Sequence, residues 1–276
     1  MKKIDELLNQ NPAGTLFHYT NASGLLGILG SGKIWASSAL NLNDSGEFRY
    51  AVSVISDHIR DYLKRAHGPT NTLLGKVQEG LSTLTTGVQA YVASFSEQGD
   101  LLSQWLAYSG AGNGYAVGFG DGHFSAARLS GFTLVRCVYE EQEQQTLASA
   151  VTEVIMEHIQ EEDMAKLSKA LAAAVAMKHP GFRQEAEWRL VKTIGLGMGL
   201  SNEALFREGR NGVVPYLEAP LSVEPLLIPE AITIGPNTDM DSAAIGLYTL
   251  LDSKGLFPIL GHKKVKITPS RTPYRP

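Results

Sequence analysis

The sequence predicts an α+β protein built on a mixed β-sheet. Apolar, β-branched and aromatic runs that are typical of strands recur at 15–20, 89–96, 115–119 and 131–139. Longer segments with apolar residues at helical spacing lie between them, notably 46–66 and a helical block over 146–178. Hydrophobic residues make up 43% and charged residues 19% of the 276 residues, which are ordinary values for a folded protein. We therefore expect one domain over 1–276, with helical insertions at about 46–86 and 146–178.

Charge and cysteine content exclude several classes of protein. The formal net charge of -4 gives no global attraction to nucleic acid or to an anionic membrane. The single cysteine, Cys137, excludes an intramolecular disulfide and a cysteine-based zinc site, and its strand-like setting favours a buried, inert thiol. No stretch approaches ~18 uninterrupted apolar residues, and the N-terminus lacks the apolar run of a signal peptide. We expect a cytoplasmic protein without membrane contact.

The N-terminal third alternates short strands and helices. Residues 3–10 predict a short surface helix, and 15–20 a strand. Asn21 occupies an N-cap position before an apolar helix that Gly30 and Gly32 end, and 33–36 returns to an extended segment. A long helix over 46–66 follows the polar turn 41–45, and a second helix is expected at 72–84.

The middle of the chain combines strands with the helical block. Alternation over 89–96 places Tyr91, Ala93 and Phe95 on one side of a strand and Val92, Ser94 and Ser96 on the other. A short helix at 101–108 and a glycine-rich turn at 110–114 lead into the strand 115–119. The strand 131–139 precedes the helical block, whose acidic residues 161–163 predict a solvated junction between two helices.

The C-terminal third is predicted to complete the sheet. Pro180 breaks the helical block, and 185–191 reads as a loop that runs into a strand. Further extended segments are expected at 212–218 and 230–235. Asp239 or Asp241 caps a helix to about 253, and 263–268 supplies the last strand.

Three short pieces of sequence carry groups that could share a site. They are His18 and Thr20 on the first strand, Ser94 and Ser96 on a middle strand, and Glu185 and Glu187 at the start of a late strand. A mixed sheet can bring such distant strands together. If the strand already includes Glu185, both carboxylates face the same way, and such a pair suits glycosidic chemistry because a fixed carboxylate stabilises an oxocarbenium ion.

Simpler interpretations of the same residues remain open. Glu185 and Glu187 could be a solvated strand edge with Arg183 or Arg189 as partner, and His18 could be a core imidazole that is hydrogen-bonded to backbone. The seven histidines are scattered and none forms a His-x-x-x-His pair, so a metal hydrolase ranks last.

Five segments together resemble a bacterial family of unknown function, DUF2971. They are Leu16-Phe17-His18-Tyr19-Thr20, Asn41 to Phe48, Ser94-Phe95-Ser96-Glu97, Asp100 to Tyr108 and Glu185-Ala186-Glu187-Trp188-Arg189. The first strand and its following helix are also similar to the opening of ADP-ribosyltransferase folds, with which that family is grouped. The resemblance implies an ADP-ribosyltransferase-like core, in which a mixed, split β-sheet carries inserted helices.

The resemblance also implies roles for single residues. His18 matches the residue that holds the adenosine-side ribose of NAD, the backbone of Tyr19 would clasp the nicotinamide carboxamide, and Thr20 would hydrogen-bond nearby. Ser94-Phe95-Ser96 is similar to a Ser-Thr-Ser strand that helps to bind NAD. Glu187 matches the catalytic carboxylate and Glu185 the residue that positions the acceptor.

The function implied is that of an enzyme, an NAD-dependent ADP-ribosyltransferase acting on a protein or nucleic-acid acceptor. This chain combines a first-strand histidine with Ser-x-Ser and Glu-x-Glu motifs, and Trp105 and Tyr108 are either stacking residues or core anchors. One alternative is an NAD glycohydrolase. Another is a non-catalytic module that binds a nucleotide or nucleic acid, with phosphate contacts from Arg183, Arg189, Arg207 and Arg210.

Overall fold

A computed structural model describes residues 1–41, 45–65, 88–109, 113–161, 163–195, 203–209, 212–224, 226–236, 239–256 and 265–274. Within these ranges ten strands form one hydrogen-bonded network. The strands are β1 (Leu16–Thr20), β2 (Lys33–Ser38), β3 (Val88–Ser96), β4 (Tyr115–Phe119), β5 (Thr133–Arg136), β6 (Glu187–Gly195), β7 (Leu205–Gly209), β8 (Gly212–Pro220), β9 (Ala231–Ile234) and β10 (Lys266–Pro269).

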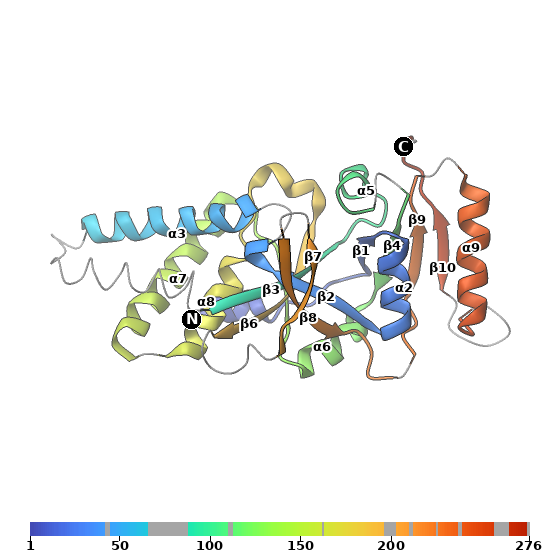
Figure 1. Ribbon diagram of the computed structural model, residues 1–276. Coiled ribbons are helices and arrows are strands. Elements are labelled where there is room, and N and C mark those ends of the chain that lie inside the picture. Colours follow the sequence, from blue (N-terminus) through green and yellow to red (C-terminus); the bar gives the residue numbers. More distant parts are fainter. Residues whose placement is uncertain are drawn as a thin grey trace.

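Helices pack around this sheet and at both ends of the molecule (Figure 1). They are α1 (Lys2–Leu8), α2 (Ala22–Ser31), α3 (Ser45–Arg65), α5 (Leu102–Tyr108), α6 (Ser125–Leu129), α7 (Glu141–Glu161), α8 (Met164–Ala174) and α9 (Met240–Ser253). Three short 3-10 helices are η1 (Ala39–Asn41), η3 (Asp121–Phe124) and η4 (Pro180–Glu185). Helices α3, α7 and α8 lie at one end of the molecule, and α9 packs beside β9 and β10 at the other (Figure 1).

The sheet divides at β3. One edge of β3 pairs with β6 along its whole length, from Val88 opposite Gly195 to Ser96 opposite Glu187. The other edge is shared, because β2 pairs at 91–92 and β1 pairs only at Ser96. Two branches therefore leave β3, one through β1, β4, β9 and β10 and one through β2, β8 and β7. β9 and β10 are parallel and the other strand pairs antiparallel, which confirms the mixed α+β class.

Apolar residues on the two faces of β3 belong to different cores. Ala93 and Phe95 join one cluster together with Val117 from the first branch and Leu217 from the second. Val92 joins a second cluster, which is built mainly from α1, α3, α7 and α8. The predicted alternation of β3 is confirmed, and it separates a face between the two branches from a face covered by helices.

Helix caps and strand positions follow the sequence closely. The Asn21 side chain accepts a hydrogen bond from the Gly24 N–H, Gly32 ends α2 with a φ of 68°, and the Asp239 side chain caps α9. Helix α7 begins at Glu141, earlier than the predicted 146, since acidic residues in a first turn interact favourably with the helix dipole. The predicted helix at 72–84 lies outside the described residues, and α6 and β7 were not predicted.

Among the described residues, no helix is long and apolar enough to span a membrane.

The Asp100 carboxylate fastens the C-terminal segment to the loop that precedes α5. It accepts hydrogen bonds from Trp105 Nε1 at 2.8 Å, from the Arg271 N–H at 2.7 Å and from the hydroxyls of Ser270 and Thr272. Burial alone would raise the pKa of Asp100, but these hydrogen bonds outweigh it and lower that pKa. Asp100 thereby links the last strand to the start of α5.

We expect Asp100→Ala to lower the free energy of unfolding by about 1 to 3 kcal/mol at pH 7, because several donors lose one shared acceptor. A carboxylate whose pKa falls on folding stabilises the protein above its unfolded pKa of about 3.9, and this contribution is lost as the pH falls through the folded value. Urea unfolding at pH 7 and pH 3 should show a smaller effect of Asp100→Ala at pH 3.

The control is Asp57→Ala, which removes an exposed ion pair with Arg60 and should change the free energy of unfolding by less than about 0.5 kcal/mol. Equal effects of the two substitutions would contradict a stabilising role for the hydrogen bonds of Asp100.

Candidate functional site

Glu185 and Glu187 lie on either side of a tight turn where η4 meets β6. Ala186 between them has a positive φ of 42°, and Glu187 is the first residue of the strand. The Ser96 hydroxyl donates to the Glu185 carbonyl at 2.6 Å, and the Glu97 N–H donates to the Ala186 carbonyl at 3.1 Å. The segment is a loop that runs into a strand, as predicted, and Glu185 lies before the strand, so the turn and not the strand brings the two carboxylates together.

The two carboxylates meet at the ammonium group of Lys178. Its Nζ lies 2.6 Å from Glu185 Oε2 and 2.9 Å from Glu47 Oε1, and it also contacts Glu187 Oε2. Only 2% of the Lys178 side chain is exposed. Three carboxylates from α3, η4 and β6 therefore surround one buried cation.

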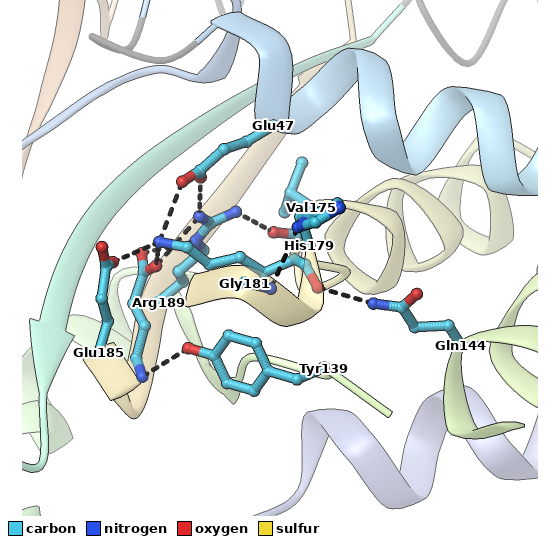
Figure 2. Close-up of polar contacts among 10 residues, drawn as sticks. Glu47, Tyr139, Gln144, Val175, His179, Gly181, Glu185 and Arg189 are labelled. Carbon is cyan, nitrogen blue, oxygen red and sulfur yellow. Dashed lines mark hydrogen bonds and ion pairs between the residues drawn. The ribbon is translucent and has the colours of Figure 1, made fainter. Parts of the chain in front are cut away.

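Arg189 is the second buried cation of this cluster (Figure 2). Its Nε lies 2.8 Å from Glu187 Oε1, its Nη2 contacts Glu47 Oε2, and its Nη1 donates to the Val175 carbonyl. The cluster of Glu47, Lys178, Glu185, Glu187 and Arg189, called the glutamate cluster below, holds three acids and two bases. With all five groups ionised it carries a formal charge of -1.

Hydrogen bonds fix the backbone on which the glutamate cluster is built (Figure 2). The Tyr139 hydroxyl accepts from the Glu187 N–H at 2.9 Å. Gln144 Nε2 donates to the Lys178 carbonyl at 2.7 Å, and the Tyr50 hydroxyl donates to Gln144 Oε1 at 2.7 Å. A site whose supporting groups are bonded in this way keeps its charged groups in one geometry.

The charges of the cluster stabilise one another. Burial alone would raise the pKa of Glu187, but the neighbouring Arg189 and Lys178 lower it to about 2. Burial alone would also lower the pKa of Lys178, but the carboxylates of Glu187 and Glu47 raise it. Glu187 is therefore an anion, and Lys178 a cation, throughout the physiological pH range.

Tyr108 lies within electrostatic range of this cluster. It is the last residue of α5 and is 41% exposed. Burial of its phenol, followed by the negative charge of Glu187, raises the pKa of Tyr108 to about 12. Trp105, the other candidate for stacking, is buried and lies edge-on to Tyr19 with ring centroids 4.6 Å apart. Trp105 is thus a core anchor, whereas Tyr108 can face a ligand.

His18 and Thr20 lie on the opposite face of the sheet from the two glutamates. Phe17 pairs directly with Ser96, and Ser96 with Glu187, so these three residues share a face and the neighbours of Phe17 take the other. The His18 ring lies 5.7 Å from the ring of Phe95, and its Nδ1 lies 2.9 Å from the Ser94 carbonyl oxygen. The His18 side chain is thus held by the backbone of β3, and burial lowers its pKa.

The Tyr19 side chain has a structural role. The hydroxyl donates to the Gln98 carbonyl at 2.6 Å and accepts from the Leu101 N–H at 2.9 Å, so it holds the loop before α5. Ser94 lies opposite Arg189 and therefore shares the face of the glutamate cluster, as Ser96 does. Of the predicted site residues, the structure thus places Tyr19, Ser94, Ser96, Glu185 and Glu187 on one face.

Two members of the cluster were missed in the sequence, namely Glu47 and Lys178. The arginines proposed for phosphate contacts are dispersed: Arg189 is buried among carboxylates, Arg183 pairs with Glu140 at 2.6 Å, and Arg210 lies outside the described residues. Cys137 is buried, as predicted, and burial raises its pKa. In the described ranges no group of three or more histidine, cysteine, aspartate or glutamate side chains is placed to hold a metal ion.

The fold and the site define a mixed α+β protein with a buried glutamate cluster where its sheet divides. Residues 104–190 match the sequence model of a family described as "Protein of unknown function (DUF2971)". The matched segment runs from α5 to β6 and contains Tyr108, Lys178, Glu185, Glu187 and Arg189. This match supports the resemblance to DUF2971, and no curated protein and no solved structure matches the chain.

Proposed function

We propose that this protein is an NAD-consuming ADP-ribosyltransferase, which cleaves the nicotinamide–ribose bond of NAD and transfers ADP-ribose to a macromolecular acceptor. The observation that carries the proposal is the convergence of Glu185 and Glu187 at Lys178, with Glu187 held as an anion. The Tyr108 phenol lies within electrostatic range of Glu187. The site then combines a fixed negative charge with an aromatic surface.

That combination suits the chemistry of the bond that breaks. The C1'–N bond electrons leave with neutral nicotinamide, positive charge spreads over C1' and the ring oxygen of ribose, and an ionised carboxylate stabilises this charge. The acceptor then bonds to C1' and loses a proton. A cluster with a formal charge of -1 favours the cationic pyridinium of NAD and the oxocarbenium ion over an anion such as phosphate.

The two glutamates are suited to different roles. Glu187 has ion pairs with both Lys178 and Arg189, and only 6% of its side chain is exposed, so its charge and position are constant. Glu185 is 14% exposed, and its one ion pair within the described residues is with Lys178. In the proposal Glu187 stabilises the transition state, and Glu185 orients or deprotonates the acceptor.

The divergence of β1 from β3 supports a role for the first strand. The two strands pair only at Phe17 and Ser96, so the following backbone at Tyr19 lies along an opening edge that could clasp the nicotinamide carboxamide. His18 bonds Ser94 across this divergence and remains our candidate for the adenosine-side ribose, with Thr20 beside it. Ser94 and Ser96, on the face of the glutamates, would contact the nicotinamide side.

We expect the purified protein to release nicotinamide from NAD, which chromatography of the products detects directly. NAD labelled in its adenylate group distinguishes the reactions: label on a protein or nucleic acid indicates transfer, and label only in free ADP-ribose indicates the alternative NAD glycohydrolase. Heat-unfolded protein is the control. Absence of nicotinamide release with protein, DNA, RNA and water as acceptors would overturn the proposal.

A further inference from the structure

The outer face of the branch formed by β2, β8 and β7 carries two aromatic rings and an arginine. Tyr216 lies opposite Ser37 of β2 and opposite Leu205 of β7, so the three side chains share a face. Trp35 and Arg207 are each two residues along their strands from this row and have the same orientation. Ile34 and Leu217 point the other way, into the core between the two branches.

Trp35 and Tyr216 form a tilted aromatic pair on this face, and the indole is partly exposed. Their ring centroids are 4.5 Å apart and the rings are inclined by 35°. Tyr216 is buried, whereas Trp35 is 51% exposed. A partly exposed indole that packs against a second ring can stack a planar ring with little loss of side-chain freedom.

Arg207 places a positive charge beside this aromatic pair. Its Nη2 donates to the Ser37 hydroxyl at 3.0 Å and its Nη1 to the Glu208 carbonyl at 3.2 Å. Its Nε is buried and has no hydrogen-bond partner in the described part of the chain, where the guanidinium also has no ion pair with a carboxylate. Lys33 on β2 is neutralised by Glu218 at 2.5 Å, so among the described residues of this face Arg207 carries the unbalanced charge.

A buried guanidinium N–H without a partner is destabilising, and an acceptor atom that reaches the guanidinium can offset this cost. An anionic oxygen is the strongest acceptor for a guanidinium. The ligand indicated by these features has a planar ring to cover Trp35 and an anionic group to reach Arg207.

We propose that Trp35, Tyr216 and Arg207 form a nucleotide-binding subsite, in which a nucleobase stacks on the Trp35 indole and a phosphate oxygen contacts the Arg207 guanidinium. This subsite is separate from the glutamate cluster, although Val92, which lies opposite Ser37, belongs to the same face of β3 as Ser94. It does not depend on NAD cleavage. The nucleotide can be free or part of a single strand, since both offer a base and a phosphate.

Tryptophan fluorescence can report on this subsite in the full chain. The sequence has three tryptophans, and Trp105 and Trp188 are buried, so nucleotide quenching reports mainly on Trp35. We expect saturable quenching by 5'-AMP or by a short single-stranded oligonucleotide. Quenching by AMP alone would indicate a free nucleotide, and much tighter quenching by the oligonucleotide would indicate a strand. If neither AMP nor the oligonucleotide gave saturable quenching, the proposal would be overturned.

Variants measured by calorimetry separate stacking from charge recognition. Trp35→Ala should weaken binding by about 10- to 100-fold, because base stacking on an aromatic residue contributes that much, and Trp35→Phe should retain most of it. Arg207→Gln should weaken AMP binding at least about fivefold and leave adenosine binding unchanged. The control is Tyr62→Ala, which removes another exposed aromatic residue on α3. Unchanged AMP binding by Trp35→Ala or by Arg207→Gln would refute the assignment.

Discussion

Lys178→Met lowers the free energy of unfolding by about 3 to 5 kcal/mol, which is the range expected when one partner of a buried ion pair is removed. Methionine matches the length of the lysine stem but leaves Glu47 and Glu187 paired with Arg189 alone and removes the ion pair of Glu185. The formal charge of the glutamate cluster changes from -1 to -2 in a buried position. Urea denaturation at pH 7, followed by circular dichroism, measures the difference.

The control for Lys178→Met is a lysine with an ordinary ion pair. Lys166 lies 3.2 Å from Glu157, and its side chain is 31% exposed, so Lys166→Met should cost less than about 1 kcal/mol. Adding Glu185→Gln to Lys178→Met restores the formal charge of -1 and should recover part of the loss. Equal effects of the two lysine substitutions would show that the cluster does not stabilise the fold.

Acid should reduce the effect of Lys178→Met. The pKa of Glu187 is about 2 in the folded protein and about 4.3 in an unfolded chain, so its ionisation stabilises the fold above about pH 5. This contribution decreases as the pH falls from about 5 toward 2, because Glu187 takes up a proton in the unfolded chain while it stays ionised in the folded protein. The stability difference between the wild type and the variant should therefore narrow over that interval.

Features of the fold that depend on neighbouring residues could be predicted from the sequence. Asn21 and Asp239 have short polar side chains that accept a hydrogen bond from the backbone N–H three residues ahead, so they mark helix starts locally. The alternation of β3 is equally local, and it identified Ser94 and Ser96 as sharing a face. Strand β7 was missed because it is an edge strand of five residues that needs contact on one side only.

Which residues share the site depends on how the strands are aligned with one another, and this strand register cannot be read from a local sequence pattern. A shift of one residue between β1 and β3 would move His18 to the face of Glu187. The pairing of Phe17 with Ser96 determines that His18 lies on the other face. Glu47 and Lys178 are far apart in sequence. Glu47 lies in the first turn of α3, and Lys178 follows the alanine-rich helix α8. A lysine directly after the apolar run 170–177 was the available signal, since a buried lysine requires carboxylate partners.

Glu187→Gln should decrease nicotinamide release from NAD at least about 100-fold, a loss comparable to removing one group that stabilises a charged transition state. The variant should still fold, because two carboxylates remain for the two cations and the amide oxygen can accept from Arg189 Nε. Its loss of stability should be smaller than that of Lys178→Met. Initial rates of nicotinamide release measure catalysis, and urea denaturation of the same samples establishes that the variant is folded.

Glu185→Gln provides the matched comparison, since it also removes one negative charge from the contacts of Lys178. If Glu185 acts on the acceptor, this variant should release nicotinamide within about fivefold of the wild type and transfer ADP-ribose at least about tenfold more slowly. Glu143→Gln, which alters an exposed pair with Arg136, should change neither rate. A folded Glu187→Gln variant with the wild-type rate of release would remove Glu187 from the mechanism. If Glu185→Gln and Glu187→Gln slowed nicotinamide release by the same factor, both carboxylates would act in the bond-breaking step. The total negative charge beside Lys178, and not the position of Glu187, would then determine the rate.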